Sequence, residues 1–280
     1  MSIEFVKMHG TGNDYVYVDL WTETVPDPVQ LAIDVSHRHF AVGSDGLILV
    51  AKPDQPGFAG RMVMYNSDGS ESGMCGNGLR CVAKFLFDRG RTDGATEFRL
   101  QTGAGPRGAQ IHVGADGKAE RVTLSMGAPL LAPEQIPTTL AAQGGEFEIE
   151  VGGLKLKGTP VGMGNPHFVI FVENTETFPV LEIGPLVENH PAFPKRVNAE
   201  FVQVMGPGHL RQRTWERGSG ETWACGTGAS AVCAASRLRG HSDGNVEIDL
   251  LGGRLSLSWD GQGEVKMTGN AVEVFRGTWG

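Results

Sequence analysis

Long apolar runs, blocks of like charge and an export signal are all lacking in this 280-residue sequence. No run reaches the roughly 18 apolar residues that a membrane-spanning helix needs. The first residues have no basic segment followed by an apolar one, so we expect no signal peptide and a protein of the reducing cytoplasm. The net charge of −8, without a basic tail, argues against nucleic acid as a partner.

Cysteine is also scarce, with four residues in the whole sequence. In a reducing compartment, four cysteines are expected to be thiols rather than a disulfide framework. The reactivity of individual thiols therefore becomes the question to ask of this sequence.

Glycine, in contrast, is abundant, with 41 residues that often flank short apolar runs rich in β-branched side chains. Such runs are typical of strands bounded by turns and cover residues 16–18, 47–50 and 168–172. Convincing helical patterns cover residues 75–89 and 225–239, with weaker ones near 28–39 and 183–191. Many strands and few helices predict an α+β fold rather than a series of βαβ units.

An internal repeat organises the chain. Residues 74–78 (MCGNG) align with residues 224–228 (ACGTG) at a shift of 150, and each segment runs into a helix-length stretch that ends in glycine. At a shift of 152, residues 12–15 align with residues 164–167, and each precedes a strand. Matches in the same order at nearly the same shift predict two similar halves.

The boundary between the halves is expected in a segment that contains Pro129, Pro133, Pro137 and two glycines at 144–145. We therefore predict an N-terminal half at residues 1–127 and a C-terminal half at residues 128–280, whose last segment can return to the first domain. Two similar halves suggest a pseudo-twofold arrangement in which the repeated Cys-Gly motifs face each other across a cleft.

Each repeated cysteine, Cys75 or Cys225, stands between a loop and a predicted helix. The first N–H groups of a helix lack partners within the helix, and the peptide dipoles add partial positive charge there. This surrounding favours a thiolate and lowers the pKa of a cysteine from its usual value of about 8.5. The same N–H groups form an anion site, which glycines leave open to a ligand.

Combining the two halves predicts a reaction. A substrate carboxylate held between two helix N-termini would have one thiol on each face of its α-carbon, and its bound charge would help to acidify the α-proton. One thiolate would remove that proton, and the opposite thiol would return a proton from the other side. The two thiols must then be held in opposite protonation states.

The other ionisable residues near the motifs are expected to have structural or supporting roles. Cys81 and Cys233 fall in the middle of the predicted helices and are expected to be small buried apolar residues. His167 and Glu216 lie nearest the repeated motifs in sequence and are expected to tune the protonation of the thiols. Arg217 lies in a loop that repeats the one at Asn66, where a guanidinium suits bidentate capture of a carboxylate.

Taken together, the motifs of this sequence resemble those of the diaminopimelate epimerases. The resemblance extends from the first residues to about residue 269, and its most specific parts are residues 7–15 (KMHGTGNDY), 66–81 (NSDGSESGMCGNGLRC), 164–167 (GNPH), 197–201 (VNAEF) and 215–228 (WERGSGETWACGTG).

The resemblance implies interconversion of LL- and meso-2,6-diaminopimelate, on the route to lysine and peptidoglycan, without pyridoxal phosphate or metal. It implies two pseudo-symmetric domains, each a mixed, mostly antiparallel, barrel-like sheet around a central helix, and commonly a homodimer with a small-molecule substrate and neither nucleic acid nor membrane as partner. Cys75 and Cys225 would be the acid–base pair, tuned by His167 and Glu216. Substrate contacts would come from Asn13, Asn66, Gly76, Asn77, Asn165, Asn198, Glu216, Arg217, Gly226 and Thr227.

Three positions depart from the family pattern. Tyr15 stands where Phe is common and Thr11 where Leu is common, and we assign neither a part in the chemistry. Gly46 stands in a turn where several relatives carry Gln, so we assign no substrate side-chain contact to this position.

Other functions fit the sequence less well. A related two-cysteine racemase acting on proline or hydroxyproline is the nearest alternative, although Asn77 and the pair Glu216-Arg217 favour a substrate with a second charged end. A Cys/His metal-binding module would require clustered ligands, whereas these cysteines are six, eight or about 150 residues apart. The phosphate-binding motif G-x-x-x-x-G-K-[ST] and a complete dinucleotide fingerprint are both absent. No lysine in the repeats stands out as the Schiff base that a pyridoxal phosphate enzyme needs.

Overall fold

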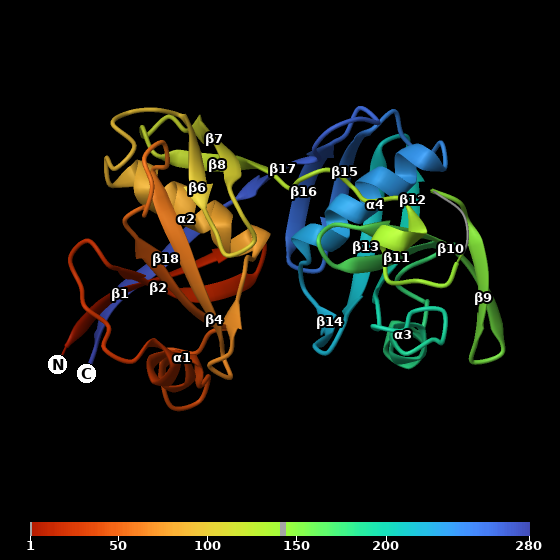
Figure 1. Cartoon of the computed structure of the whole chain (residues 1–280), viewed down its shortest axis with the longest axis horizontal. Helices are drawn as coiled ribbons and strands as arrows, with labels where there is room; N and C mark the ends of the chain where they lie inside the picture. Colours follow the sequence, from red (N-terminus) through yellow and green to blue (C-terminus); the bar gives the residue numbers. More distant parts are fainter. Residues whose placement is uncertain (1, 141–143) are drawn as a thin grey trace. The chain divides into compact units, whose positions relative to one another are not determined.

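The computed structural model describes residues 2–140 and 144–280, so residues 141–143 of the predicted linker lie outside the described residues. It confirms the α+β class: strands and four α-helices make up the described part of the chain (Figure 1). The chain forms two compact units, one of Met1–Ser125 with Thr268–Gly280 and the other of Met126–Met267. Of the helices in the described ranges, none has both the length and the apolar character that crossing a membrane requires.

The first unit is a mixed sheet around one long helix. Its strands are β1 (Ile3–Gly10), β2 (Asn13–Asp19), β3 (Gly46–Ala51), β4 (Gly60–Asn66), β5 (Glu71–Ser72), β6 (Glu97–Gln101), β7 (Arg107–Val113), β8 (Ala119–Ser125) and β18 (Val272–Trp279). Most neighbours are antiparallel, but β2 and β3 are parallel, as are β4 and β6. The last strand, β18, pairs with β1 from the first residues onward, so the end of the chain belongs to the first unit.

Helix α2 (Gly76–Asp88) packs against β1, β2, β4, β7 and β8 of this sheet. Its side chains from Leu79 to Leu86 are buried except for Lys84, as expected for a helix that strands surround. The shorter helix α1 (Pro28–Ser36) lies against β3 and β4, and Asp27 caps its first turn by accepting from the Gln30 N–H group.

The second unit repeats this topology. Its strands are β9 (Phe147–Val151), β10 (Leu154–Gly162), β11 (Pro166–Phe171), β12 (Asn198–Gly206), β13 (His209–Glu216), β14 (Gly220–Thr222), β15 (Asn245–Leu250) and β16 (Gly253–Ser258), while β17 (Lys266–Asn270) crosses from this unit into the first. The parallel pairs recur at the same places, between β11 and β12 and between β13 and β15. Two units with one order of pairing confirm the predicted pseudo-symmetric halves.

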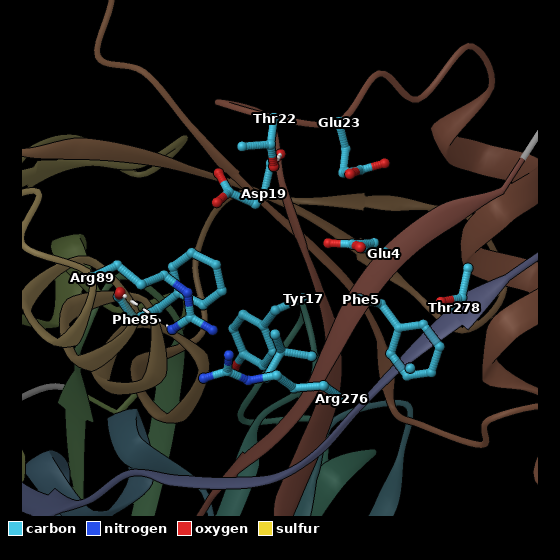
Figure 2. A pocket seen from close by; sticks show the side chains of 12 residues that line it. Glu4, Phe5, Tyr17, Asp19, Thr22, Glu23, Phe85, Arg89, Arg276 and Thr278 are labelled. Atoms are coloured by element: carbon cyan, nitrogen blue, oxygen red, sulfur yellow. Dashed lines mark hydrogen bonds between the residues drawn. The ribbon is translucent and has the colours of Figure 1, made fainter.

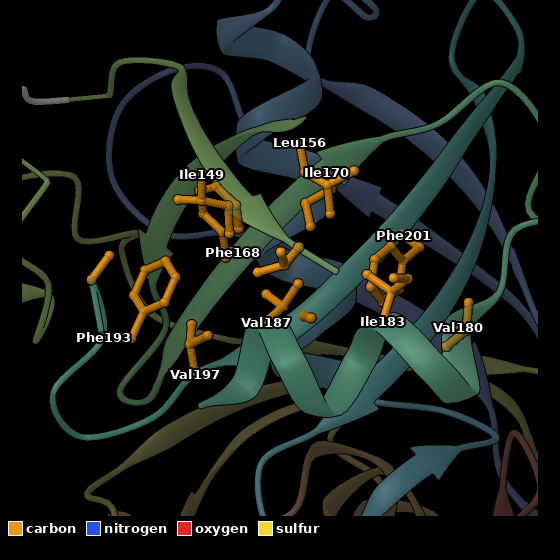
Figure 3. Packing of buried hydrophobic residues seen from close by; sticks show 13 residues of the cluster. Ile149, Leu156, Phe168, Ile170, Val180, Ile183, Val187, Phe193, Val197 and Phe201 are labelled. Carbon is orange, nitrogen blue, oxygen red and sulfur yellow. The ribbon is translucent and has the colours of Figure 1, made fainter. Parts of the chain in front are cut away.

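Helix α4 (Gly226–Leu238) takes the place of α2 and contacts β10, β11, β12, β15 and β16. It is built largely from Gly, Ala, Ser and Cys, so strands can approach it closely on several sides. Helix α3 (Val180–Glu188) covers the outer face of β12 and β13. Figure 3 shows Ile183 and Val187 of this helix pointing toward Phe168, Ile170 and Phe201 in the apolar cluster of the second unit.

The predicted helices at 75–89 and 225–239 are confirmed as α2 and α4. The one predicted near 28–39 ends earlier, because His37 adopts an extended conformation after Ser36. The one predicted near 183–191 begins at Val180 and contains Pro185, which removes a hydrogen bond but does not end the helix. Among its described residues, the predicted linker contains a short 3₁₀ turn, Pro133–Gln135, and an isolated antiparallel bridge between Leu130 and Gly162.

Candidate active site

Cys75 is the N-cap of α2. Its extended backbone leads into the helix, and its Sγ accepts a hydrogen bond from the Gly78 N–H group at 3.5 Å. A Cβ on Gly78 would lie 2.6 Å from Cδ1 of Ile48, so a larger residue here would displace the end of that side chain. The loop-to-helix position predicted for this thiol is therefore the observed one.

Asn13 connects this thiol to a charged network. The Cys75 Sγ donates to Oδ1 of Asn13 at 3.1 Å, and the Asn13 amide donates to Oδ2 of Asp45 at 2.6 Å. Arg38 in turn pairs with both Asp45 and Asp14. Asp45 thus fixes the amide of Asn13 with its oxygen toward the thiol, a role that was not predicted for the turn before β3.

Tyr15 also belongs to the surroundings of Cys75. Burial raises the pKa of its phenol well above the usual value, and negative charge on Cys75 and Asp45 raises it further. Tyr15 therefore lies near Cys75, while the expectation that it has no part in the chemistry stays a prediction. A signal was present in the sequence, because Tyr15 lies two residues beyond Asn13 in a strand and so faces the same side.

Asn77, in the first turn of α2, is held by a buried arginine. Nη2 of Arg80 donates to Oδ1 of Asn77 at 2.9 Å and to Oγ1 of Thr11 at 2.7 Å. Arg80 and Thr11 were assigned no role from the sequence, because their contact joins residues far apart in the chain.

Cys225 is the N-cap of α4, and its Sγ accepts from the Gly228 N–H group at 3.4 Å. The hydroxyl of Thr227 lies 3.5 Å from the same sulfur. The expected lowering of the cysteine pKa does not hold here. Burial raises the pKa of Cys225 well above its usual value, and the carboxylates of Glu216 and Glu200 raise it further, which outweighs the helix N-terminus.

Glu216 ends β13 beside this thiol. Burial raises the pKa of its carboxyl group, although hydrogen bonds from Thr222 and Cys225 oppose the shift. Oγ1 of Thr222 donates to Oε1 of Glu216 at 2.5 Å. A thiol and a carboxyl group whose pKa values are both raised form a pair that can hold and pass a proton.

His167 is completely buried behind this pair. Its Nδ1 lies 2.8 Å from Oε1 of Glu200, and its Nε2 lies 2.9 Å from Oδ1 of Asn165. Glu200 also accepts from Gln212 and Thr214, at 2.7 Å and 2.6 Å. Glu200 was missed from the sequence, where it stands in an apolar strand; an acidic residue at such a position signals a buried, partnered carboxylate.

The remaining predicted residues lie at strand ends or in the adjoining turn. Oδ1 of Asn198 accepts from the backbone N–H of Arg217 at 2.9 Å, so the two residues lie together. The guanidinium of Arg217 is exposed and donates to the carbonyl of Lys195 at 3.0 Å. Asn66 at the end of β4 donates to Oγ of Ser70 within its own turn.

Cys81 and Cys233 are buried thiols, as predicted. Burial raises the pKa of Cys81 to about 11 and that of Cys233 to about 12. Both are therefore unreactive at neutral pH, in contrast to a solvent-accessible thiol at an anion site.

A separate hollow of about 340 Å³ lies in the first unit, between the start of the chain, β2, the end of α2 and β18. Figure 2 shows Arg89 and Arg276 reaching toward it beside Phe85 and Tyr17. Its lining contains none of the predicted site residues of that unit within the described ranges. The hollow therefore lies apart from the predicted site residues of the first unit, although Tyr17 lines it and is also influenced by Cys75.

Comparison with known proteins identifies the family. The sequence profile of the family described as "Diaminopimelate epimerase" matches residues 5–131 and 159–274. A diaminopimelate epimerase of Acetivibrio thermocellus is 49% identical over 277 residues, which cover 98% of this chain and 98% of the relative. One of Leptospira biflexa is 48% identical over 282 residues and 99% of both chains.

Solved structures of more distant proteins share the fold. A hydroxyproline epimerase from Agrobacterium vitis has a TM-score of 0.67 at 16% identity and covers 99% of this chain and 91% of its own. A PhzF-family phenazine biosynthesis protein of Bacillus anthracis has a TM-score of 0.70 at 18% identity and covers 100% and 99%. Given the near-complete match to its profile and to relatives almost half identical in sequence, the chain belongs to the diaminopimelate epimerase family.

Proposed function

We propose that this protein interconverts LL- and meso-2,6-diaminopimelate by a cofactor-independent reaction with two thiols, in the synthesis of lysine and peptidoglycan precursors. One of the two sulfurs, as thiolate, removes the α-proton of the LL substrate, and the pair of electrons from that C–H bond is delocalised into the carboxylate. The other sulfur, as thiol, gives its proton to the opposite face of the same carbon. In the reverse reaction the two sulfurs exchange roles.

The observation that supports this proposal most is the repeated position of the two cysteines. Each is the N-cap of the long helix of its unit, and each sulfur accepts from the N–H group three residues later. The first-turn groups of the two helices, from Gly76, Asn77, Gly226 and Thr227, hold the carboxylate at the reacting centre. Donors aimed at this carboxylate stabilise the charge that develops on it in the transition state.

Recognition of the rest of the substrate is assigned to the polar residues around the two helix starts. These residues are Asn13, Asn66, Asn165, Asn198, Glu216 and Arg217. The exposed guanidinium of Arg217 is suited to a carboxylate at the distal end of the substrate, because it presents two parallel N–H donors.

His167 and Glu216 are proposed to set the protonation of the thiols. The charge of Glu216 raises the pKa of Cys225, which supports this role. The raised pKa of Cys225 favours its protonated form, which is the form that an acid needs. We also propose a homodimer, as the resemblance implies, and a cytoplasmic location, as the sequence analysis expects. Light scattering during size-exclusion chromatography tests the homodimer.

Exchange with solvent deuterium tests the reaction. The purified, metal-free protein is incubated with LL-diaminopimelate in D₂O without added cofactor, and stereochemistry is followed together with α-deuterium. The expected product is the meso isomer with deuterium at the inverted centre. Absence of inversion by folded, reduced protein contradicts the substrate assignment, and proline and hydroxyproline are then tested as substrates of the alternative racemase.

Single variants assign the thiols. Cys75→Ala and Cys225→Ala are each expected to abolish inversion, because each removes one of the two proton carriers. Cys233→Ala is the matched control, since it replaces a buried thiol of α4 that has no part in the reaction. It is expected to retain turnover, and appreciable turnover by either of the first two variants contradicts the two-thiol reaction.

A further inference from the structure

Corresponding positions in the two units carry different charge. Arg80 is the fifth residue of α2, and the fifth residue of α4 is Ser230. Both side chains are fully buried, but Ser230 only donates to the carbonyl of Gly226 within its own helix. The fold can therefore accommodate a small neutral residue at this position, so packing alone does not require a guanidinium there.

In the strands that pack against these helices, the charged residue is on the Cys225 side instead. Ile48 is the third residue of β3 and Glu200 the third residue of β12. Each packs under the corresponding glycine of the helix: a Cβ on Gly78 would lie 2.6 Å from Ile48, and one on Gly228 would lie 2.5 Å from Glu200. The Cys225 side thus has a carboxylate where the Cys75 side has an apolar residue.

Arg80 holds three segments around Cys75. Its Nη2 donates to Thr11 and Asn77, and its Nε donates to the backbone carbonyl of Asn270 at 3.1 Å. Thr11 lies in the turn that leads to Asn13, the acceptor for the Cys75 thiol. The guanidinium therefore fixes both the turn that carries Asn13 and the amide of Asn77, with the NH₂ group of Asn77 turned away from Arg80.

The approach of this turn to α2 is close. A Cβ on Gly10 would lie 2.7 Å from the carbonyl oxygen of Asn77 and 3.0 Å from Nη2 of Arg80. Thr11 follows with a positive φ of 56°, a backbone conformation that residues other than glycine rarely adopt. The contact with Arg80 holds Thr11 in this conformation, so the geometry near the thiol depends on the guanidinium.

We propose that Arg80 is a positioning residue for the reaction assigned above: its guanidinium fixes Asn77 and the turn of Asn13 around Cys75, and its positive charge favours the Cys75 thiolate against the hydrogen bond that the thiol donates to Asn13. An arginine remains protonated in proteins. Burial lowers the pKa of Arg80, and negative charge on Cys81 and Cys75 opposes this shift. The attraction is mutual, so the guanidinium favours the thiolate.

Other titratable groups face Cys75 as well. They are Tyr15 and Tyr17 of β2 and Cys81 of α2, while Asp45 before β3 is connected to the thiol through Asn13. The pKa values of both tyrosines are raised well above the usual value, and that of Cys81 is raised to about 11. Between about pH 6 and 9 these three groups stay neutral, so a change of Arg80 can be read without interference from them.

The rate of alkylation by iodoacetamide as a function of pH tests the proposal, because only the thiolate reacts. The background is Cys225→Ala, which leaves Cys75 as the reactive thiol; a Cys75→Ala/Cys225→Ala variant gives the residual rate of the buried cysteines. In this background we expect the pH midpoint to lie below the usual value of about 8.5. A midpoint at or above that value overturns the proposal even if every Arg80 variant fails to fold.

Arg80→Gln is expected to slow alkylation at neutral pH about tenfold and to raise the midpoint, since an opposite charge nearby shifts a pKa by about one unit or more. Arg80→Lys is expected to restore most of the rate, and Ser230→Ala, the corresponding change in α4, to leave it unaltered. Equal rates for Arg80→Gln and its parent overturn the proposal. Alkylation involves no substrate, so its outcome is independent of the deuterium experiment.

Discussion

At the scale of single residues, the two cysteines have unlike electrostatic surroundings although each caps a helix. Near Cys75 lie a guanidinium and an amide oxygen; near Cys225 lie the carboxyl groups of Glu216 and Glu200. A reaction in which one thiolate takes a proton from the substrate while the opposite thiol gives one back needs the two sulfurs in opposite protonation states, and unlike surroundings favour this arrangement.

Removing the charge of Glu216 is expected to make Cys225 more reactive. In a Cys75→Ala background, Glu216→Gln should increase the rate of alkylation of Cys225 several-fold at about pH 8.5, the ordinary pKa of a cysteine. Glu216 raises the pKa of this thiol, so its neutralisation lowers the pH at which the thiolate forms. Burial is the larger cause and remains, so the midpoint should still exceed the ordinary value.

The matched control for this prediction is Thr222→Val. It removes the hydroxyl that donates to Oε1 of Glu216 but keeps the carboxylate. Alkylation of Cys225 should not become faster in this variant. A rate that is unchanged or lower in Glu216→Gln would show that the carboxylate does not hold the proton on Cys225.

At the scale of elements, the sequence predicts what local chemistry determines. The Cys-Gly-x-Gly starts of α2 and α4 are predictable because the helix begins where the glycines end the loop. The end of α1 was predicted too late, since no glycine or proline marks the extended residue His37. These outcomes depend on residues within a few positions of one another.

The contacts that complete the site are not predictable in this way. Arg80 reaches Thr11 across 69 positions and Asn270 across 190, and Glu200 reaches His167 across 33. Such pairs are set by the order of the strands around each helix, which hydrophobic periodicity does not specify. Tyr15 is an intermediate example. The face of the strand on which it lies can be predicted from Asn13, but its proximity to Cys75 cannot.

The two glycines of the helix starts should differ in their tolerance of a methyl group. Gly228→Ala is expected to destabilise α4 by about 3 kcal/mol and Gly78→Ala to destabilise α2 by only about 1 kcal/mol. In Gly228→Ala the new Cβ meets the carboxylate of Glu200, which three hydrogen bonds hold in place. In Gly78→Ala it meets the end of the Ile48 side chain. The gain in helix propensity, about 1 kcal/mol, is common to both variants.

Amide hydrogen exchange measures this difference, because it reports the local opening free energy of each helix separately. The amides of α4 should lose more protection in Gly228→Ala than those of α2 lose in Gly78→Ala. Equal losses would mean that Glu200 moves as easily as Ile48 and that its hydrogen bonds do not fix it.

At the scale of the whole molecule, the chain closes its first unit with its last residues. β18 pairs with β1 from Ile3 opposite Trp279 to His9 opposite Val272, and Asn270 just before it accepts from Arg80. β1 in turn pairs with β2, whose first residue is Asn13. The surroundings of Cys75 therefore depend on a segment that follows the entire second unit in sequence.

Deletion of residues 272–280 is expected to destabilise the first unit and spare the second. β1 would lose one of its two neighbouring strands, so its amides and those of α2 should lose protection against hydrogen exchange. The amides of β10 to β13 and α4 should stay protected, because their pairing lies within the second unit. Val274→Thr is the matched control, since it changes an exposed side chain of β18 and keeps the strand. Protection that is retained in the first unit, or lost equally in both, would contradict the dependence of the first unit on the end of the chain.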